Sequence, residues 1–170
     1  MSRYVRVIRR SRWDLEAKPE WVGDADMPAD PLADLCTQEN KLSLWEIQSD
    51  GDLRRCVSAV AATRQHLSNL DCLLFEAEVC ENLTIPIGLS PGNTPDDEVN
   101  AWHRDAENLT ASKLINLGRI LWDSGERRRF LPQEVRAGLM ESVERGAIER
   151  RKLPDAVRAK ISITGRDSIR

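Results

Sequence analysis

Residues 41–47, Lys-Leu-Ser-Leu-Trp-Glu-Ile, form the clearest strand pattern in the chain. Apolar and polar side chains alternate over the first residues of this stretch, so that Leu42 and Leu44 share one face while Lys41 and Ser43 share the other. A repeat of two residues is typical of a strand that buries one face. The sequence therefore predicts a strand here, with its leucines in the core.

The segments around this strand predict a second strand, a loop and a helix. Residues 3–13 alternate in part, which favours a strand whose arginines face solvent or an acidic partner. Residues 14–40 are rich in proline and aspartate, which indicates a long acidic loop. After the capping residues 49–52, apolar residues at three-to-four spacing over 53–68 predict an amphipathic helix.

The second half of the chain predicts further helices. Thr94 and Pro95 are residue types that cap and open a helix, and the apolar stripe after them favours one long helix over 95–123. Pro132 opens another helix, and Pro154 opens a short one. A short helical piece is also expected at residues 73–82.

Together these elements predict an α+β fold that is predominantly helical. A small N-terminal antiparallel β pair is expected to be packed by the 53–68 helix and followed by a helical bundle around the 95–123 helix. The expected organisation is a small α+β region at residues 1–93, with the long acidic loop, and a helical region at residues 94–170, within one compact domain overall. An alternative α/β arrangement uses residues 84–87 as a third strand.

Charge is separated along the chain. Residues 1–20, 21–107 and 108–170 carry net charges of +3, −12 and +6, whereas the whole chain carries only −3. Blocks of like charge attract oppositely charged surfaces, so the pattern points to binding partners rather than to a reaction. The sequence leaves open whether the acidic middle and the basic ends pair within the chain.

Motifs that carry catalysis are missing from the sequence. It contains no metalloprotease helix, no paired zinc cysteines, no calcium loop, no phosphate loop and no serine hydrolase elbow. Asp96, Asp97, Glu98, His103 and Glu107 have the residue types of an oxygen-rich metal site, and the sequence leaves open whether His103 and Glu107, one helical turn apart in the expected helix, have a metal or catalytic role. We therefore expect no enzyme activity, no catalytic residues, no metal and no cofactor. We also expect no membrane partner, because no apolar run reaches the roughly 20 residues of a membrane-spanning helix.

Protein docking is the function that the sequence favours. We expect a non-catalytic cytoplasmic adaptor or regulatory subunit, of undetermined oligomeric state, that binds a protein partner through charge-assisted docking. Tryptophan and arginine dominate interface hot spots, and the chain has five tryptophans. The expected partner-binding residues are tryptophans near loops or element ends and the basic run after them, namely Trp13, Trp21, Trp122, Arg127, Arg128 and Arg129.

The alternative function is that of a nucleic-acid-associated factor. Clusters of Lys and Arg bind phosphates, and basic residues gather at both ends of this chain. The residues expected in that case are Arg3, Arg6, Arg9, Arg10 and Arg12 at the N-terminus and Arg150, Arg151 and Lys152 near the C-terminus. A sequence pI of about 5.5 opposes this alternative, because dedicated nucleic-acid binders are usually strongly basic.

Overall fold

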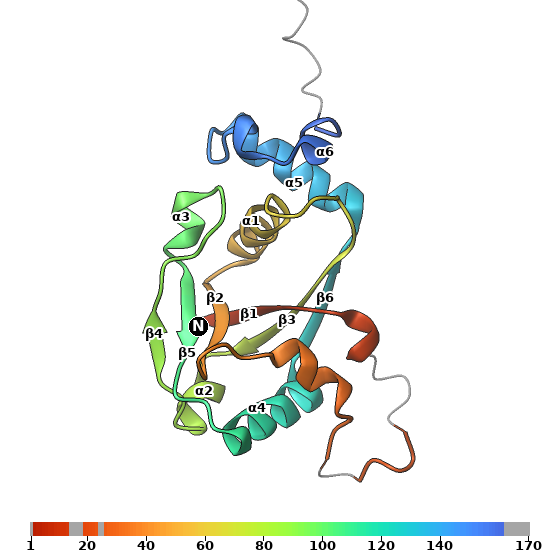
Figure 1. Ribbon diagram of the computed structural model, residues 1–170, viewed down its shortest axis with the longest axis vertical. Helices are drawn as coiled ribbons and strands as arrows, with labels where there is room; N and C mark the ends of the chain where they lie inside the picture. Colours follow the sequence, from red (N-terminus) through yellow and green to blue (C-terminus); the bar gives the residue numbers. More distant parts are fainter. Residues whose placement is uncertain (1, 14–18, 24–25, 162–170) are drawn as a thin grey trace, which may run out of the picture. The chain divides into compact units, whose positions relative to one another are not determined.

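The protein is an α+β fold that contains a six-stranded antiparallel sheet in its described residues (Figure 1). The computed structural model describes residues 2–13, 19–23 and 26–161. The chain packs into two compact units, and each unit is assembled from separate stretches of sequence. Unit 1 is made of residues 1–48, 71–91 and 102–129, and unit 2 is made of residues 49–70, 92–101 and 130–170.

The sheet has the strand order β4-β5-β2-β1-β3-β6. Its strands are β1 (Arg3–Ile8), β2 (Leu42–Ile47), β3 (Leu70–Glu76), β4 (Ile87–Leu89), β5 (His103–Ala106) and β6 (Glu126–Phe130). β1 lies between β2 and β3 and pairs antiparallel with both, so that Tyr4 is opposite Glu46 on one side and Phe75 on the other. The strand predicted around Leu42 and Leu44 is confirmed as β2, and both leucines are fully buried.

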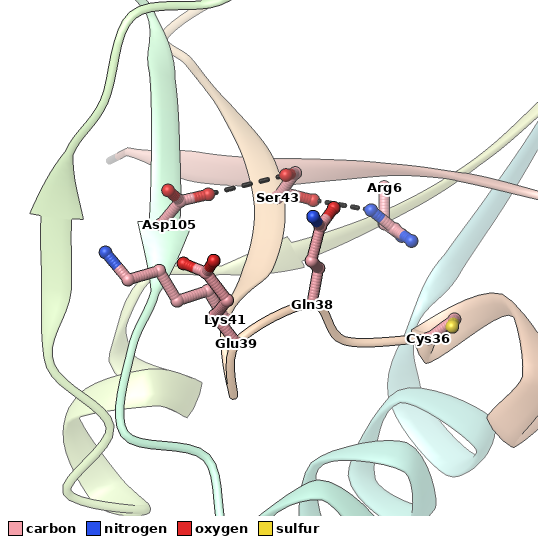
Figure 2. A pocket seen from close by; sticks show the side chains of 7 residues that line it. All are labelled: Arg6, Cys36, Gln38, Glu39, Lys41, Ser43 and Asp105. Atoms are coloured by element: carbon pink, nitrogen blue, oxygen red, sulfur yellow. Dashed lines mark hydrogen bonds between the residues drawn. The ribbon is translucent and has the colours of Figure 1, made fainter.

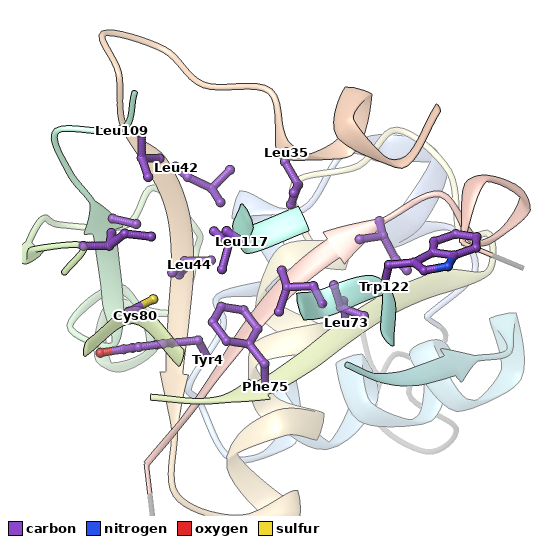
Figure 3. Close-up of a cluster of buried hydrophobic side chains, with 14 of the residues drawn as sticks. Tyr4, Leu35, Leu42, Leu44, Leu73, Phe75, Cys80, Leu109, Leu117 and Trp122 are labelled. Atoms are coloured by element: carbon purple, nitrogen blue, oxygen red, sulfur yellow. The ribbon is translucent and has the colours of Figure 1, made fainter. Parts of the chain in front are cut away.

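One face of this sheet carries the hydrophobic core of unit 1 (Figure 3). The helical elements of unit 1 are η1 (Arg10–Arg12), η2 (Asp30–Leu35), α2 (Glu78–Asn82) and α4 (Ala111–Ser124). Leu117 and Leu121 of α4 are fully buried in the same cluster as Leu44 of β2 and Leu73 of β3. Gly118 of α4 lies so close to η2 that an added Cβ would be 2.9 Å from Leu32 Cδ2. Sheet, α4 and η2 therefore form one packed core.

Unit 2 is built around two helices that pack against each other, α1 (Asp50–Ala61) and α5 (Pro132–Glu144). Ser49 caps α1 by accepting a hydrogen bond from the Asp52 amide. Short elements complete the unit: α3 (Asp97–Asn100), η3 (Arg150–Lys152) and α6 (Asp155–Arg158). The carboxylate of Asp96 is buried, caps α3, and receives two hydrogen bonds from Arg55 of α1 at 2.8 and 2.9 Å.

The prediction of a predominantly helical fold with a small N-terminal β pair is wrong. The expected long helix at residues 95–123 consists of α3, β5 and α4. Asn108 has a φ of 53°, which a continuous right-handed helix does not allow, and Thr110 then caps α4 by accepting a hydrogen bond from the Lys113 amide. β5 is held by its pairing with β2 and β4, which a local three-to-four pattern does not reveal.

Two other strands were also missed for physical reasons. β3 lies partly where a helix at residues 73–82 was expected, and a buried run such as Cys72–Phe75 has no alternation to distinguish a strand from a helix. β6 is Glu-Arg-Arg-Arg-Phe, which has the composition of a solvated charged segment. The expected helical region at residues 94–170 therefore contains two strands of the sheet, β5 and β6.

Candidate functional site

The N-terminal basic segment and the acidic loop meet at one carboxylate, that of Asp34. This residue is 9% exposed, and its oxygens accept hydrogen bonds from the Arg9 amide at 2.8 Å, from Arg12 Nη1 at 2.8 Å and from Trp13 Nε1 at 3.0 Å. A buried carboxylate with three donors is held firmly, because each donor replaces a water. Part of the basic end is thus neutralised by the acidic middle within unit 1.

The three tryptophans predicted as partner anchors lie in two different environments. Trp13 is completely buried and Trp122 is 2% exposed, and their ring centroids are 6.2 Å apart. Partner-binding tryptophans at loops or element ends are expected to be exposed, and the burial of these two contradicts that part of the prediction: Trp13 donates to Asp34 in the interior, and Trp122 belongs to the hydrophobic core of unit 1. Trp21 is 77% exposed, and its role in docking stays a prediction.

The basic run at residues 127–129 lies on β6, the last strand at one edge of the described sheet. Arg127 places its guanidinium carbon 5.6 Å from the centroid of the Trp122 ring and donates to the Trp122 carbonyl at 2.6 Å. Arg129 binds the carboxylate of Asp71 with two hydrogen bonds of 2.7 and 3.1 Å. These contacts fix the strand against β3 and α4.

Arg128 lies between these two arginines in sequence and, because side chains alternate along a strand, on the opposite face. It binds Glu126 at 3.1 Å, and Arg3 of β1 binds the other oxygen of Glu126 at 3.1 Å. The structure therefore brings Arg3, from the set expected to bind nucleic acid, next to the predicted protein-binding arginines. Arg128 has 38% of its side chain exposed.

The other residues of the nucleic-acid set are dispersed. Arg9 and Arg10 are exposed, whereas Arg6 is half-buried in a pocket. Arg151 and Lys152 belong to η3 of unit 2 and bind Glu149 at 2.6 and 3.2 Å. Both cations lower the pKa of the Glu149 carboxyl.

His103 and Glu107 do not form a pair. His103 lies on β5, where its Nδ1 is 2.7 Å from Ser90 Oγ and its ring is 4.8 Å from that of Trp45. Glu107 follows the strand and binds Lys41 at 2.8 Å. In an extended chain, residues four apart are more than 10 Å apart, so the spacing that matters on a helix is lost. The described residues contain no cluster of three or more metal-binding side chains.

A polar pocket of about 300 Å³ opens beside β2 in unit 1 (Figure 2). Sequence reasoning singled out only one of its residues, Arg6, and for another role. The pocket is lined by Arg6, Cys36, Gln38, Glu39, Lys41, Ser43 and Asp105.

A tight turn forms one wall of this pocket. Gln38 and Lys41 exchange backbone hydrogen bonds of 3.1 and 2.9 Å, and the two residues between them, Glu39 and Asn40, have φ values of 54° and 59°. Turns with two positive φ values usually contain glycine or asparagine. Asn40 fits this preference and Glu39 does not, so a carboxylate is held at the pocket at some cost in backbone strain.

Arg6 forms another wall where β1 and β2 separate. The paired register of these strands ends at Val5 and Trp45. Beyond it, Arg6 donates from Nε to the Asp34 carbonyl at 3.0 Å and from Nη1 to the Ser43 carbonyl at 2.9 Å. Burial lowers the pKa of the Arg6 guanidinium. The Arg6 side chain thus binds η2 and β2 at the point where the next residue pair of β1 and β2 would otherwise form, and it lies in the wall of the pocket.

No helix in the described residues is long and apolar enough to cross a membrane. Comparison of the chain with protein-family models, with curated proteins and with solved structures finds no match to any of them.

Proposed function

We propose that the chain is a non-catalytic adaptor or regulatory subunit of the cytoplasm that binds an acidic, extended segment of a protein partner along β6. The observation that carries the proposal is the combination of an outer strand and three consecutive arginines. An edge strand offers backbone groups that an added strand can pair with, and arginines select acidic side chains on it. The presence of all four cysteines as thiols agrees with a reducing compartment.

The other edge of the described sheet, β4, is a poorer template. It spans only Ile87–Leu89, and it is flanked by Pro86 and Pro91. Proline has no N–H to donate, and short edge strands resist pairing. β6 has five residues without a proline.

The arginines also decide which partner fits β6. Pairing of two copies of β6 would place arginines opposite arginines, and like charges directly across a strand pair are destabilising. An acidic segment gains the same backbone hydrogen bonds with favourable charge contacts. Nucleic acid is less favoured, because the sequence pI of about 5.5 is that of an acidic chain, whereas dedicated nucleic-acid binders are usually strongly basic.

A labelled peptide of alternating glutamate and valine, titrated with the full chain and followed by fluorescence anisotropy, tests the proposal. We expect saturable binding that weakens with salt, and no binding of the peptide with lysine in place of glutamate. A version with N-methylated backbone amides should also fail to bind, because it cannot extend the sheet. Equal binding of all three peptides would overturn the proposal.

Charge reversal supplies the matched control. Arg128→Glu should lower affinity by about tenfold or more, since it places a like charge against the acidic segment. Arg151→Glu, an equal change at an exposed residue of η3 in unit 2, should leave affinity unchanged. If duplex DNA binds more tightly than the peptide, and both variants lose that binding, the nucleic-acid alternative replaces this proposal.

A further inference from the structure

The pocket beside β2 holds a guanidinium, that of Arg6, whose hydrogen bonds go to backbone carbonyls. Arg6 donates hydrogen bonds from Nε and Nη1 to two neutral backbone carbonyls, and it forms no ion pair with any described residue. Buried charges in proteins are normally paired, because a guanidinium out of water loses solvation. Its lowered pKa has burial as its largest cause. The charge of Asp34 also acts on Arg6, but the Asp34 carboxylate is bound by Arg12, Trp13 and the Arg9 amide, so no described carboxylate pairs directly with Arg6 at this wall.

The opposite side of the pocket has more carboxylates than cations. Lys41 binds Glu107 at 2.8 Å, and this hydrogen bond is the main cause of its raised pKa, with Asp105 and Glu39 contributing through their charge. One ammonium thus faces three carboxylates. Asp105 has only a 3.4 Å hydrogen bond from Ser43 Oγ among the described residues. This wall therefore carries more negative than positive charge.

The two imbalances lie at opposite ends of one cavity. Figure 2 shows Asp105, Glu39 and Lys41 on one side, Arg6 and Cys36 on the other, and Ser43 and Gln38 between them. A ligand with a single charge would satisfy only one end. A ligand with a negative and a positive end would satisfy both.

We infer that this pocket binds a small zwitterion, with its carboxylate on Arg6 and its ammonium group at Glu39 and Asp105. Arginine recognises a planar carboxylate with two parallel N–H donors from neighbouring nitrogens, and Arg6 retains the N–H groups of Nη2 and the second N–H of Nη1 for this purpose. Ammonium groups take carboxylate acceptors, which Glu39 and Asp105 supply. The strained turn at Glu39 is explained if its carboxylate contributes to binding.

The size of the pocket restricts the ligand further. A volume of about 300 Å³ equals that of about ten water molecules. This suits an amino acid or a short ω-amino carboxylate better than a nucleotide or a peptide. The inference does not depend on the docking proposal, because β6 contributes no residue to this pocket.

Calorimetric titration of the full chain with unbranched ω-amino carboxylates, from glycine to 6-aminohexanoate, tests the inference. We expect one chain length to bind saturably, and butyrate and butylammonium to bind at least about tenfold more weakly, since each satisfies one end only. Alkylation of the exposed thiol of Cys36 by iodoacetamide should slow in the presence of the binding probe. If no probe binds, or if butyrate alone binds equally well, the inference is wrong.

Variants at each end of the pocket have matched controls. Arg6→Gln and Asp105→Asn should each weaken binding by about tenfold. Arg10→Gln and Asp30→Asn make the same changes at exposed residues of unit 1 outside the pocket and should bind like the parent chain. If Arg6→Gln does not fold, Asp105→Asn and the protection of Cys36 in the parent chain still decide the outcome. Unchanged binding in Asp105→Asn would overturn the assignment of the ammonium end.

Discussion

Arg12 and Arg128 belong to the two basic ends of the chain, but the structure uses them differently. Arg12 binds Asp34, whose side chain is only 7% exposed and also receives donors from Trp13 and the Arg9 amide. Arg128 binds Glu126 at the outer strand of the described sheet, where both side chains are well exposed. Equal formal charges therefore have unequal energetic roles.

The difference between these two regions shows that net charge along the sequence does not tell which charged side chains are buried in the structure and which are exposed. Removing one member of a buried, hydrogen-bonded cluster leaves the remaining polar groups with neither a protein partner nor water, which lowers the free energy of unfolding. Removing one member of an exposed pair costs little, because water replaces it. The Asp34 cluster thus holds the acidic loop to β1 and η1, whereas the pair of Arg128 with Glu126 lies at the exposed outer strand of the described sheet, where the proposed acidic segment would compete with Glu126.

The largest effect is expected for Asp34→Ala. It leaves Trp13 Nε1, the Arg9 amide and Arg12 without their shared acceptor, so we expect a loss of about 3 kcal/mol in the free energy of unfolding. Urea denaturation followed by circular dichroism measures this change. Asp30→Ala, at an exposed residue of η2, is the control and should change stability by less than about 0.5 kcal/mol. Equal losses in the two variants would contradict the role of Asp34.

The sequence predicts some of these features and misses others for identifiable reasons. β2 is predictable because Leu42 and Leu44 alternate with polar residues, and the cap of α1 because Ser49 precedes Asp52 by three residues. β5 and β6 are not, because their pairing partners lie far away in sequence. Formation of such strands depends on the assembled sheet more than on their own residue preferences.

The same limit applies to the candidate sites. The run of arginines at 127–129 is visible in the sequence, but its position on a sheet edge is not. The pocket combines Arg6 of β1, Glu39 of a turn and Asp105 of β5, which no local spacing connects. A glutamate in a left-handed turn is the one signal that the backbone adds, and the sequence alone does not predict a positive φ for that residue.

Gly125→Ala is expected to have the second largest effect. Gly125 joins α4 to β6, and an added Cβ would lie 2.5 Å from the Leu121 carbonyl oxygen and 2.7 Å from Leu73 Cδ1. Because the first of these is a backbone atom, the start of β6 must move, and we expect a loss of about 2 kcal/mol. Urea denaturation measures the loss, and the acidic peptide should bind more weakly. Gly23→Ala has no atom within 4 Å of its new Cβ and should leave both properties unchanged.

Asp71→Asn separates stability from docking. The carboxylate of Asp71 holds Arg129 with two hydrogen bonds in a partly exposed pair, so we expect a loss of about 1 kcal/mol in the free energy of unfolding. The same change removes a negative charge next to β6. Affinity for the acidic peptide should therefore rise in the less stable variant, as measured by anisotropy. A fall in affinity would show that the position of Arg129, rather than its charge, controls docking.

Arg128→Ala should have the smallest effect on stability. Its pair with Glu126 is exposed, and Glu126 keeps its second partner, Arg3. We expect the free energy of unfolding to change by less than about 0.5 kcal/mol, because exposed pairs contribute little. The acidic peptide should nevertheless lose affinity, since this arginine lies on the docking strand. A variant that is as stable as the parent chain and still deficient in binding would distinguish the two basic regions; a loss of stability comparable with that of Asp34→Ala would place Arg128 among the structural charges instead.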